Sequence, residues 1–339
     1  MPRKTKHNDI TSPDKLAQVN RENMRLKEDF LNYLKSLRRS QGTLSGYNND
    51  LDIIFTYIME QLGNKDFRNL TKRDIISIQN WLVDNGNSPA RIRRVKSAMS
   101  SLSNYCENIL ADDDPDYKGY RAVVRKIENP PLQPVREKTV WADEELENLL
   151  NLLVNKNKYE IACFVALGMY GGRRKSELCR FKVSDFDDSH LVCDGSLYKS
   201  APILTKGGKM LECYTLAHKF RPYLDLWIGY RNEHGIQSDW LFPDKGNPTE
   251  HIQISTVNSW ANTLSMMTGR DFYVHALRHY YCSALIRSGI PDSVIVDIIG
   301  WSSSEMLKIY NDNPKDDRIG MYFTKDGIVA QQAKGFSEI

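Results

Sequence analysis

The strongest constraint on the fold is the helical period of the apolar residues between positions 22 and 110. Four runs there repeat apolar side chains every three or four residues, and residues typical of helix ends separate them. The pattern predicts a compact four-helix domain at residues 22–111. The boundary residues are the N-caps Thr71 and Ser88, Pro89 at a first helical position, and the closing glycines Gly63 and Gly86.

The segments around this domain differ from it in composition. Residues 1–21 have no useful periodicity, which predicts a flexible N-terminal arm. Residues 112–138 begin with acids and end with three prolines, which predicts an extended linker. A second domain is expected at 139–312, followed by a C-terminal tail at 313–339.

The second domain has mostly helical periodicity, with one short exception. Between His190 and Leu216 the period becomes strand-like, and the Gly207-Gly208 pair between two such runs predicts a hairpin. The predicted fold class is therefore mainly α with a small antiparallel β-sheet, an α+β architecture in two domains.

Composition excludes several classes of protein. No run of eighteen apolar residues exists and the basic N-terminus has no apolar stretch after it, so neither a membrane span nor a secretory signal is expected. The six cysteines form no CxxC pair and have no zinc-like spacing, so buried free thiols in a reducing cytoplasm are expected.

Positive charge is concentrated in the last predicted helix of the first domain. Between Asn85 and Tyr105 four basic residues occur and no acid, which suits a phosphate backbone, while a solvated helix face remains the alternative. If the partner is duplex DNA, Ser88–Tyr105 is the helix expected to enter its major groove. Its expected DNA-binding residues are Arg91, Arg93, Arg94 and Lys96.

Two arginines follow a glycine pair in "GGRRKSEL". Glycines let another chain or a ligand approach closely, and an arginine there can offer a fork of donors to an anion. Arg173 is a candidate DNA contact. Glu177 lies three residues after Arg174, on the same helical face, and can hold that guanidinium in place. The alternative is an ordinary surface ion pair.

A second group lies in "YVHALRHYYCSALIRSG". His275 and Arg278 share one face of an otherwise apolar helix, and a buried arginine requires an anion or equivalent partner. His279 completes an HxxxH spacing with His275. The intervening glutamate and a third ligand are missing, so no metal site is predicted.

Four motifs, "GGRRKSEL", "TKGGK", "HALRH" and "IIGWSSSEMLKIY", occur in this order. The series resembles the catalytic domain of the tyrosine recombinase (phage integrase) family over residues 140–312. That family carries Arg-x-x-Glu-Leu, a hairpin lysine, His-x-x-Arg and a tyrosine nine residues after a Gly-His step. The helical first domain is similar only in type to the family's core-binding domain. The matching catalytic positions are Arg174, Lys206 (with Lys209 as its alternative), His275, Arg278, Trp301 and Tyr310, with Glu177 in support.

The resemblance implies metal-free cleavage of DNA with no cofactor. Tyr310 would attack the scissile phosphate and form a 3′-phosphotyrosyl link, with Arg174 and Arg278 holding the phosphate oxygens. His275 would take the tyrosine proton and Lys206 would protonate the leaving 5′-hydroxyl. Trp301 replaces the usual histidine, and its indole N–H donates but cannot exchange a proton, unless the residue only packs.

The implied function is site-specific strand exchange that integrates or excises a phage or mobile element. The two domains are expected to clamp duplex DNA carrying specific attachment sites, as a tetramer of protomers on two duplexes in the bacterial or archaeal nucleoid. The tail is expected to pack on a neighbouring subunit, and accessory DNA-bending or directionality proteins stay open as partners. The alternatives are a chromosome- or plasmid-dimer resolvase, an enzyme like a type IB topoisomerase, and a non-enzymatic DNA-binding regulator.

Overall fold

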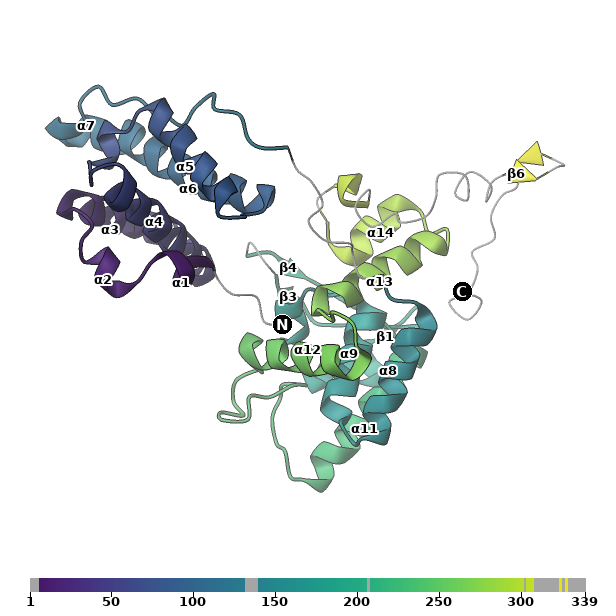
Figure 1. The fold of residues 1–339 in the computed structure, drawn as a ribbon. Helices are drawn as coiled ribbons and strands as arrows, with labels where there is room; N and C mark the ends of the chain where they lie inside the picture. The colour runs from purple at the N-terminus through teal and green to yellow at the C-terminus, as the bar shows by residue number, and fades with distance from the viewer. Residues whose placement is uncertain are drawn as a thin grey trace. The chain divides into compact units, whose positions relative to one another are not determined.

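The computed structural model describes residues 6–131, 140–205, 208–301, 303–307, 323–324 and 327–328. The chain divides into two compact units, Met1–Glu137 and Lys138–Ile339, each with its own hydrophobic core (Figure 1). None of the described helices is long and apolar enough to cross a membrane.

Four long helices build the first unit, as the apolar period predicts. Each contributes a buried side chain to one core, namely Phe30, Ile54, Ile78 and Met99 in chain order. Leu37, which follows the last residue of the first of these helices, Ser36, is exposed. The four helices are α3 (Arg21–Ser36), α4 (Gln41–Gln61), α5 (Lys72–Asp84) and α6 (Pro89–Tyr105).

The N-terminal arm is more ordered than predicted. Helices α1 (Lys6–Ile10) and α2 (Pro13–Leu16) both pack against α4. Val19 is buried, and Lys15 Nζ lies 2.7 Å from Glu60 Oε1. The expectation of a flexible arm is therefore wrong for residues 6–20, because short polar helices can be held by ion pairs and a few apolar anchors.

The predicted linker is folded over most of its length. The π-helical turn Cys106–Leu110 continues α6 into α7 (Ala111–Asp113), and the chain after α7 packs back against the core of the same unit. Val124 is buried in its core, and Arg125 Nη2 lies 2.7 Å from Glu107 Oε2. The linker prediction is thus wrong for residues 112–131, where ion pairs hold a polar sequence, and its remainder lies outside the described residues.

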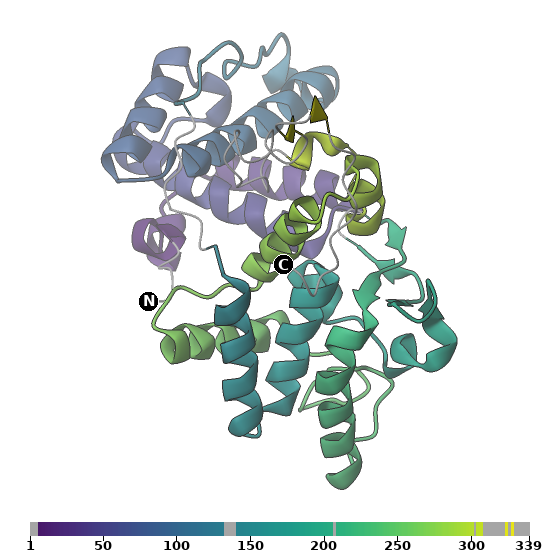
Figure 2. The ribbon, with the colours of Figure 1, turned by 90° about the vertical axis from the view of Figure 1, so that its right-hand side faces the viewer.

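A bundle of helices surrounds α9 in the second unit. The helix is apolar and buried along its length, and it packs against α8, α11 and α13. Figures 1 and 2 show α8, α9 and α11 side by side. The helices are α8 (Asp143–Asn155), α9 (Tyr159–Gly171), α10 (Lys175–Leu178), α11 (Ala217–Glu233), α12 (Ile254–Thr268), α13 (Val274–Arg287) and α14 (Asp292–Ile299).

Short antiparallel strands complete this unit, which confirms the α+β prediction. β1 (Leu191–Val192), β2 (Leu197–Lys199) and β5 (Tyr214–Leu216) form one sheet in the order β1-β2-β5. β3 (Ile203–Leu204) and β4 (Met210–Leu211) pair as the predicted hairpin. In the tail, β6 (Phe323–Thr324) pairs with β7 (Gly327–Ile328).

Candidate active site

The glycine pair at the end of α9 sets the direction of the chain into the site. Gly172 has φ +63°, and a Cβ there would lie 2.1 Å from Cδ1 of the Tyr281 ring, so only glycine fits. The chain then becomes extended at Arg174 and begins α10. This turn places the start of α10 beside α13, to which Tyr281 belongs.

Glu177 holds Arg174 as the sequence predicts. Arg174 Nη1 donates to Glu177 Oε1 at 2.9 Å, and the backbone N–H of Arg174 donates to Oε2 at 3.0 Å. Glu177 is fully buried, whereas the Arg174 side chain keeps 34% of its exposure. The surface ion pair considered as the alternative does not describe this pair, because the carboxylate has no access to water.

Arg278 reaches the same carboxylate from α13. Its guanidinium is buried, with Nη1 donating to Gly172 O at 3.0 Å and lying 3.9 Å from Glu177 Oε2. Glu177 therefore lies between two guanidinium groups that are about 100 residues apart in sequence. Two cations and one anion leave one net positive charge, which matches the single negative charge of a phosphodiester.

Trp301 lies against Arg278. The guanidinium carbon of Arg278 is 5.6 Å from the centroid of an indole ring, a cation–π arrangement. Trp301 is half-buried and also packs against the cluster that contains Tyr281, Cys282 and Ile299. The predicted packing role is thus present, and it includes a contact with a charged group that the sequence did not indicate.

His275 stands one helical turn before Arg278, and much of its surface is open to solvent although the surrounding protein partly desolvates its ring. Desolvation lowers its pKa below the usual range, and the positive charges of Arg278, His279 and Arg174 lower it further. The lowered pKa favours the neutral imidazole, the form that accepts a proton.

Two of the predicted catalytic residues, Lys206 and Tyr310, lie outside the described residues. The strands that flank Lys206 are described. Thr205 N donates to Lys209 O at 2.7 Å, which closes the hairpin. A Cβ on Gly300 would lie 2.1 Å from Leu211 Cδ2, so the hairpin contacts the end of α14.

Arg173 is not placed to contact DNA, contrary to the prediction. Its side chain is completely buried and donates to the backbone carbonyls of Ile298 and Ile299. The prediction is corrected for this residue, because its guanidinium donates to the end of α14 and does not lie on the Glu177 carboxylate, as those of Arg174 and Arg278 do. Of the two neighbouring arginines, Arg174 is the one that pairs with Glu177.

The basic residues of α6 also make contacts within the first unit. Arg91 and Arg94 both pair with the buried carboxylate of Asp50, and Arg94 lies 3.0 Å from it with 58% of its side chain exposed. Arg93 Nε donates to Pro130 O at 2.9 Å. Each of these three arginines therefore already has an ion pair or hydrogen bond within the first unit.

Among the basic residues of α6, Lys96 differs most from its predicted role as a DNA contact. It is buried and donates to the carbonyls of Ile127 and Glu128, so it holds the end of the folded segment 112–131. Burial lowers its pKa below the usual range. Its predicted contact with DNA is therefore corrected to a structural one.

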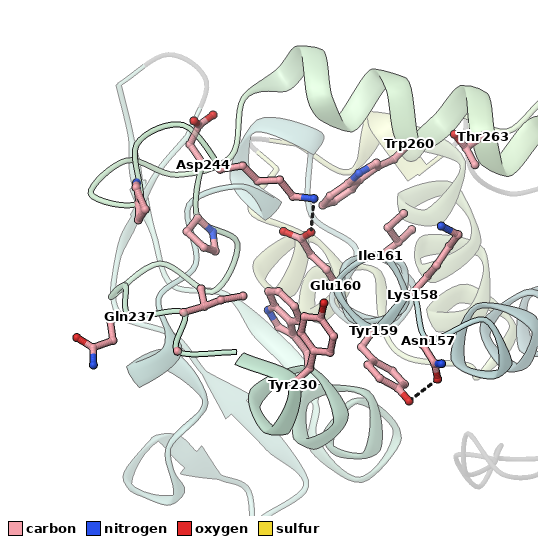
Figure 3. Close-up of a pocket in the computed structure, with 16 residues that line it drawn as sticks. Asn157, Lys158, Tyr159, Glu160, Ile161, Tyr230, Gln237, Asp244, Trp260 and Thr263 are labelled. Carbon is pink, nitrogen blue, oxygen red and sulfur yellow. Dashed lines mark hydrogen bonds and ion pairs between the residues drawn. The ribbon is translucent and has the colours of Figure 1, made fainter. Parts of the chain in front are cut away.

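A separate cavity of about 850 Å³ lies at the N-terminal end of α9 (Figure 3). Tyr159, Tyr230 and Trp260 are among the residues that line it, and none of the predicted catalytic residues that the structure describes does. Burial raises the pKa of Glu160 to about 7, although Lys245 Nζ, 3.9 Å from its Oε2, acts in the opposite direction. Sequence analysis did not identify Glu160, because "YEIACF" carries no motif.

Among the described residues, no group of three or more His, Cys, Asp or Glu side chains is arranged to hold a metal ion. The groups that the structure brings together in the second unit are Arg174, Glu177, His275, Arg278 and Trp301. Guanidinium donors around one carboxylate, next to a neutral imidazole, can bind an oxyanion and accept a proton.

Sequence profiles match both units of the chain. The profile of the phage integrase family matches residues 140–316, and the phage integrase N-terminal SAM-like domain matches residues 28–107. The SPbeta prophage-derived recombinase-like protein YomM of Bacillus subtilis (strain 168) is 28% identical over 272 residues, covering 77% of this chain and 78% of YomM.

Two tyrosine recombinases show similar coverage. One from Thermosipho africanus is 25% identical over 297 residues, covering 84% of this chain and 93% of its own. Tyrosine recombinase XerS of Streptococcus thermophilus is 24% identical over 323 residues, covering 84% and 87%.

Solved structures share the fold. XerH site-specific recombinase bound to its difH substrate has a TM-score of 0.62 at 17% identity, over 93% of this chain and 91% of XerH. A lambda integrase dimer bound to a COC′ core site has a TM-score of 0.62 at 18% identity, over 89% of this chain and 81% of that chain.

Proposed function

This chain belongs to the phage integrase family of DNA breaking-and-rejoining tyrosine recombinases, and we propose that it exchanges DNA strands at specific sites through a covalent link to Tyr310. The observation that carries the proposal is the placement of Arg174 and Arg278 on one buried carboxylate. This arrangement fixes two guanidinium groups, and together with the carboxylate they carry one net positive charge, as needed to hold a scissile phosphate.

The proposed cleavage step conserves the energy of the DNA backbone. The Tyr310 Oη–phosphorus bond forms as the bond between phosphorus and the 5′-oxygen breaks, giving a 3′-phosphotyrosyl link and a free 5′-hydroxyl. Arg174 and Arg278 stabilise the charge that develops on the non-bridging oxygens. A 5′-hydroxyl from another strand then attacks the link and releases Tyr310, so no nucleotide cofactor is consumed.

Proton transfer in this scheme falls to His275 and Lys206. The lowered pKa of His275 favours the neutral imidazole, which accepts the proton of Tyr310 as the tyrosine attacks. Lys206 donates a proton to the leaving 5′-oxygen. Trp301 contributes no proton transfer, since an indole does not titrate, and instead covers the guanidinium of Arg278.

The proposed substrate is duplex DNA with the attachment sites of a phage or mobile element. The likeness to a prophage-derived recombinase supports this choice. Resolution of chromosome or plasmid dimers is the second candidate, supported by similar coverage of XerS. We further propose a tetramer on two duplexes. XerH and the lambda integrase dimer, which share the fold, are each bound to DNA in their crystal structures.

The decisive experiment traps the covalent intermediate. The protein is incubated with nicked duplexes taken from the flanks of its own gene, and with a chromosomal dimer-resolution site. Adduct on the flanking DNA that is lost in Tyr310→Phe supports integration, whereas adduct on the resolution site supports the second candidate. An adduct that persists in Tyr310→Phe would overturn the role of this tyrosine. Relaxation of plasmid that lacks either site would favour a topoisomerase instead.

A further inference from the structure

The C-terminal end of α14 is the meeting point of two buried arginines. Arg173 donates to the carbonyls of Ile298 and Ile299, and Arg278 Nη2 lies 3.5 Å from the same Ile299 carbonyl oxygen. The last carbonyls of a helix have no partner within it and carry partial negative charge. Two guanidinium groups thus satisfy one helix end.

Arg173 relies on this helix end more than Arg278 does. Arg278 also lies near Glu177, whereas within the described part of the chain no carboxylate lies within ion-pair distance of Arg173. Burying an uncompensated cation costs several kcal/mol. The partial negative charge at the end of α14 therefore offsets the cost of burying the Arg173 guanidinium. The hydrogen bonds from Arg173 in turn hold the last carbonyls of α14 in position.

Two further contacts converge at the same point. Gly300, with φ +73°, leaves no room for a side chain against Leu211 of the β3–β4 hairpin. The next residue, Trp301, lies on the guanidinium of Arg278. The end of α14 is therefore in contact with the elements that carry Arg174, Arg278 and the predicted lysine.

We propose that Arg173 is a positioning residue that sets where the chain leaves α14 toward Tyr310. The inference builds on the proposed function, in which Tyr310 attacks a phosphate held by Arg174. Arg173 adjoins Arg174 in the chain and holds the carbonyls that precede Gly300 and Trp301. It thereby links the phosphate-binding turn to the start of the segment that carries the nucleophile, without itself touching substrate.

The test compares Arg173→Met with a matched variant in the same unit. Arg231 is also buried and donates to backbone carbonyls, those of Trp240 at 2.8 Å and Ser238 at 2.6 Å, near Glu160 at the other end of α9. Arg231→Met removes the same kind of interaction away from the candidate site. Both variants are assayed with nicked-site DNA at a temperature at which circular dichroism shows them folded.

The first readout separates binding from chemistry. Arg173→Met should lower the single-turnover rate of adduct formation by about 100-fold, the scale of a displacement of about 1 Å, while DNA affinity stays within about twofold. Arg231→Met should leave both quantities within about twofold. Arg173→Lys, which restores a buried cation, should recover part of the rate. Equal rates for the two methionine variants would overturn the inference.

The second readout needs no catalysis. Amide hydrogen exchange over 292–301 should become faster in Arg173→Met and stay unchanged in Arg231→Met, because only the first loses the donors to α14. Unchanged exchange in both would overturn the positioning role. Failure of the proposed function is recognised separately, since the wild type would then form no adduct with the same DNA.

Discussion

Replacing Glu177 by Gln should uncouple the two phosphate-binding arginines. The carboxylate accepts from Arg174 Nη1 at 2.9 Å and from its backbone N–H at 3.0 Å, and Arg278 lies 3.9 Å away. Glutamine keeps the size of the side chain but removes its charge. Its amide NH₂ would also have to face a donor, because all three neighbours are N–H groups.

The expected cost follows from burial. Removing one partner of a buried ion pair destabilises a protein by about 3–5 kcal/mol. Arg174 retains 34% of its exposure and can regain some hydration, so the lower end, about 3 kcal/mol, applies. Loss of the fixed guanidinium geometry should also slow adduct formation by about 100-fold.

Glu145 provides the matched control. It accepts from the backbone N–H of Ala142 at 2.9 Å and pairs with Arg270, much as Glu177 pairs with Arg174, but both members of this ion pair are 40% exposed. Glu145→Gln should therefore cost at most about 1 kcal/mol. Urea unfolding followed by tryptophan fluorescence measures both variants, since five of the six tryptophans lie in the second unit.

A small difference between these variants would refute the reasoning. If Glu177→Gln and Glu145→Gln lower the unfolding free energy by amounts within about 0.5 kcal/mol of each other, burial of the carboxylate contributes nothing measurable. If Glu177→Gln forms adduct at the wild-type rate, the carboxylate does not orient Arg174 for chemistry.

Three other changes test separate parts of the structure. Trp301→Ala should slow adduct formation about tenfold by uncovering Arg278 while Trp301→His retains much of the rate, and wild-type activity of the alanine variant would exclude the role. The pKa of Glu160 is raised from 4.5 to about 7 in the folded protein. Its contribution to the free energy of unfolding is therefore fully present below pH 4.5 and is lost as pH rises through 7. The wild type should lose about 3 kcal/mol relative to Glu160→Gln between pH 4.5 and 8, and parallel unfolding curves would contradict this. Arg94→Ala should weaken binding to all DNA sequences and reduce the salt slope by about one, and unchanged affinity would remove this residue from the DNA interface.

The motifs and periodicity were sufficient to predict the four long helices of the first unit and the hairpin of the second. Caps such as Thr71 and Ser88 fix helix starts through local hydrogen bonds, and both serve as N-caps in the structure. The resemblance to the Arg-x-x-Glu-Leu motif selected Arg174 and not Arg173, and Arg174 is three residues before Glu177, a spacing at which two side chains can interact. These features are encoded within a few neighbouring residues, which is why they were predictable.

The errors arose where distant residues decide the outcome. The first residues and the segment 112–131 looked like a free arm and linker, yet contacts such as Lys15 with Glu60 hold them to the first unit. Lys96 looked like a phosphate contact, yet it donates to carbonyls some 30 residues away. Local composition carries no information about such partners.

The sequence by itself determined the chemical groups and their order, because each motif is a short run whose spacing is fixed by the helix or hairpin it forms. Only the tertiary structure decided which charges are buried and what compensates them. It brought Arg278 to the carboxylate beside Arg174, turned Arg173 inward to the end of α14, and placed Trp301 over a guanidinium. Burial and charge compensation depend on packing between elements more than 100 residues apart, and no local pattern encodes that packing.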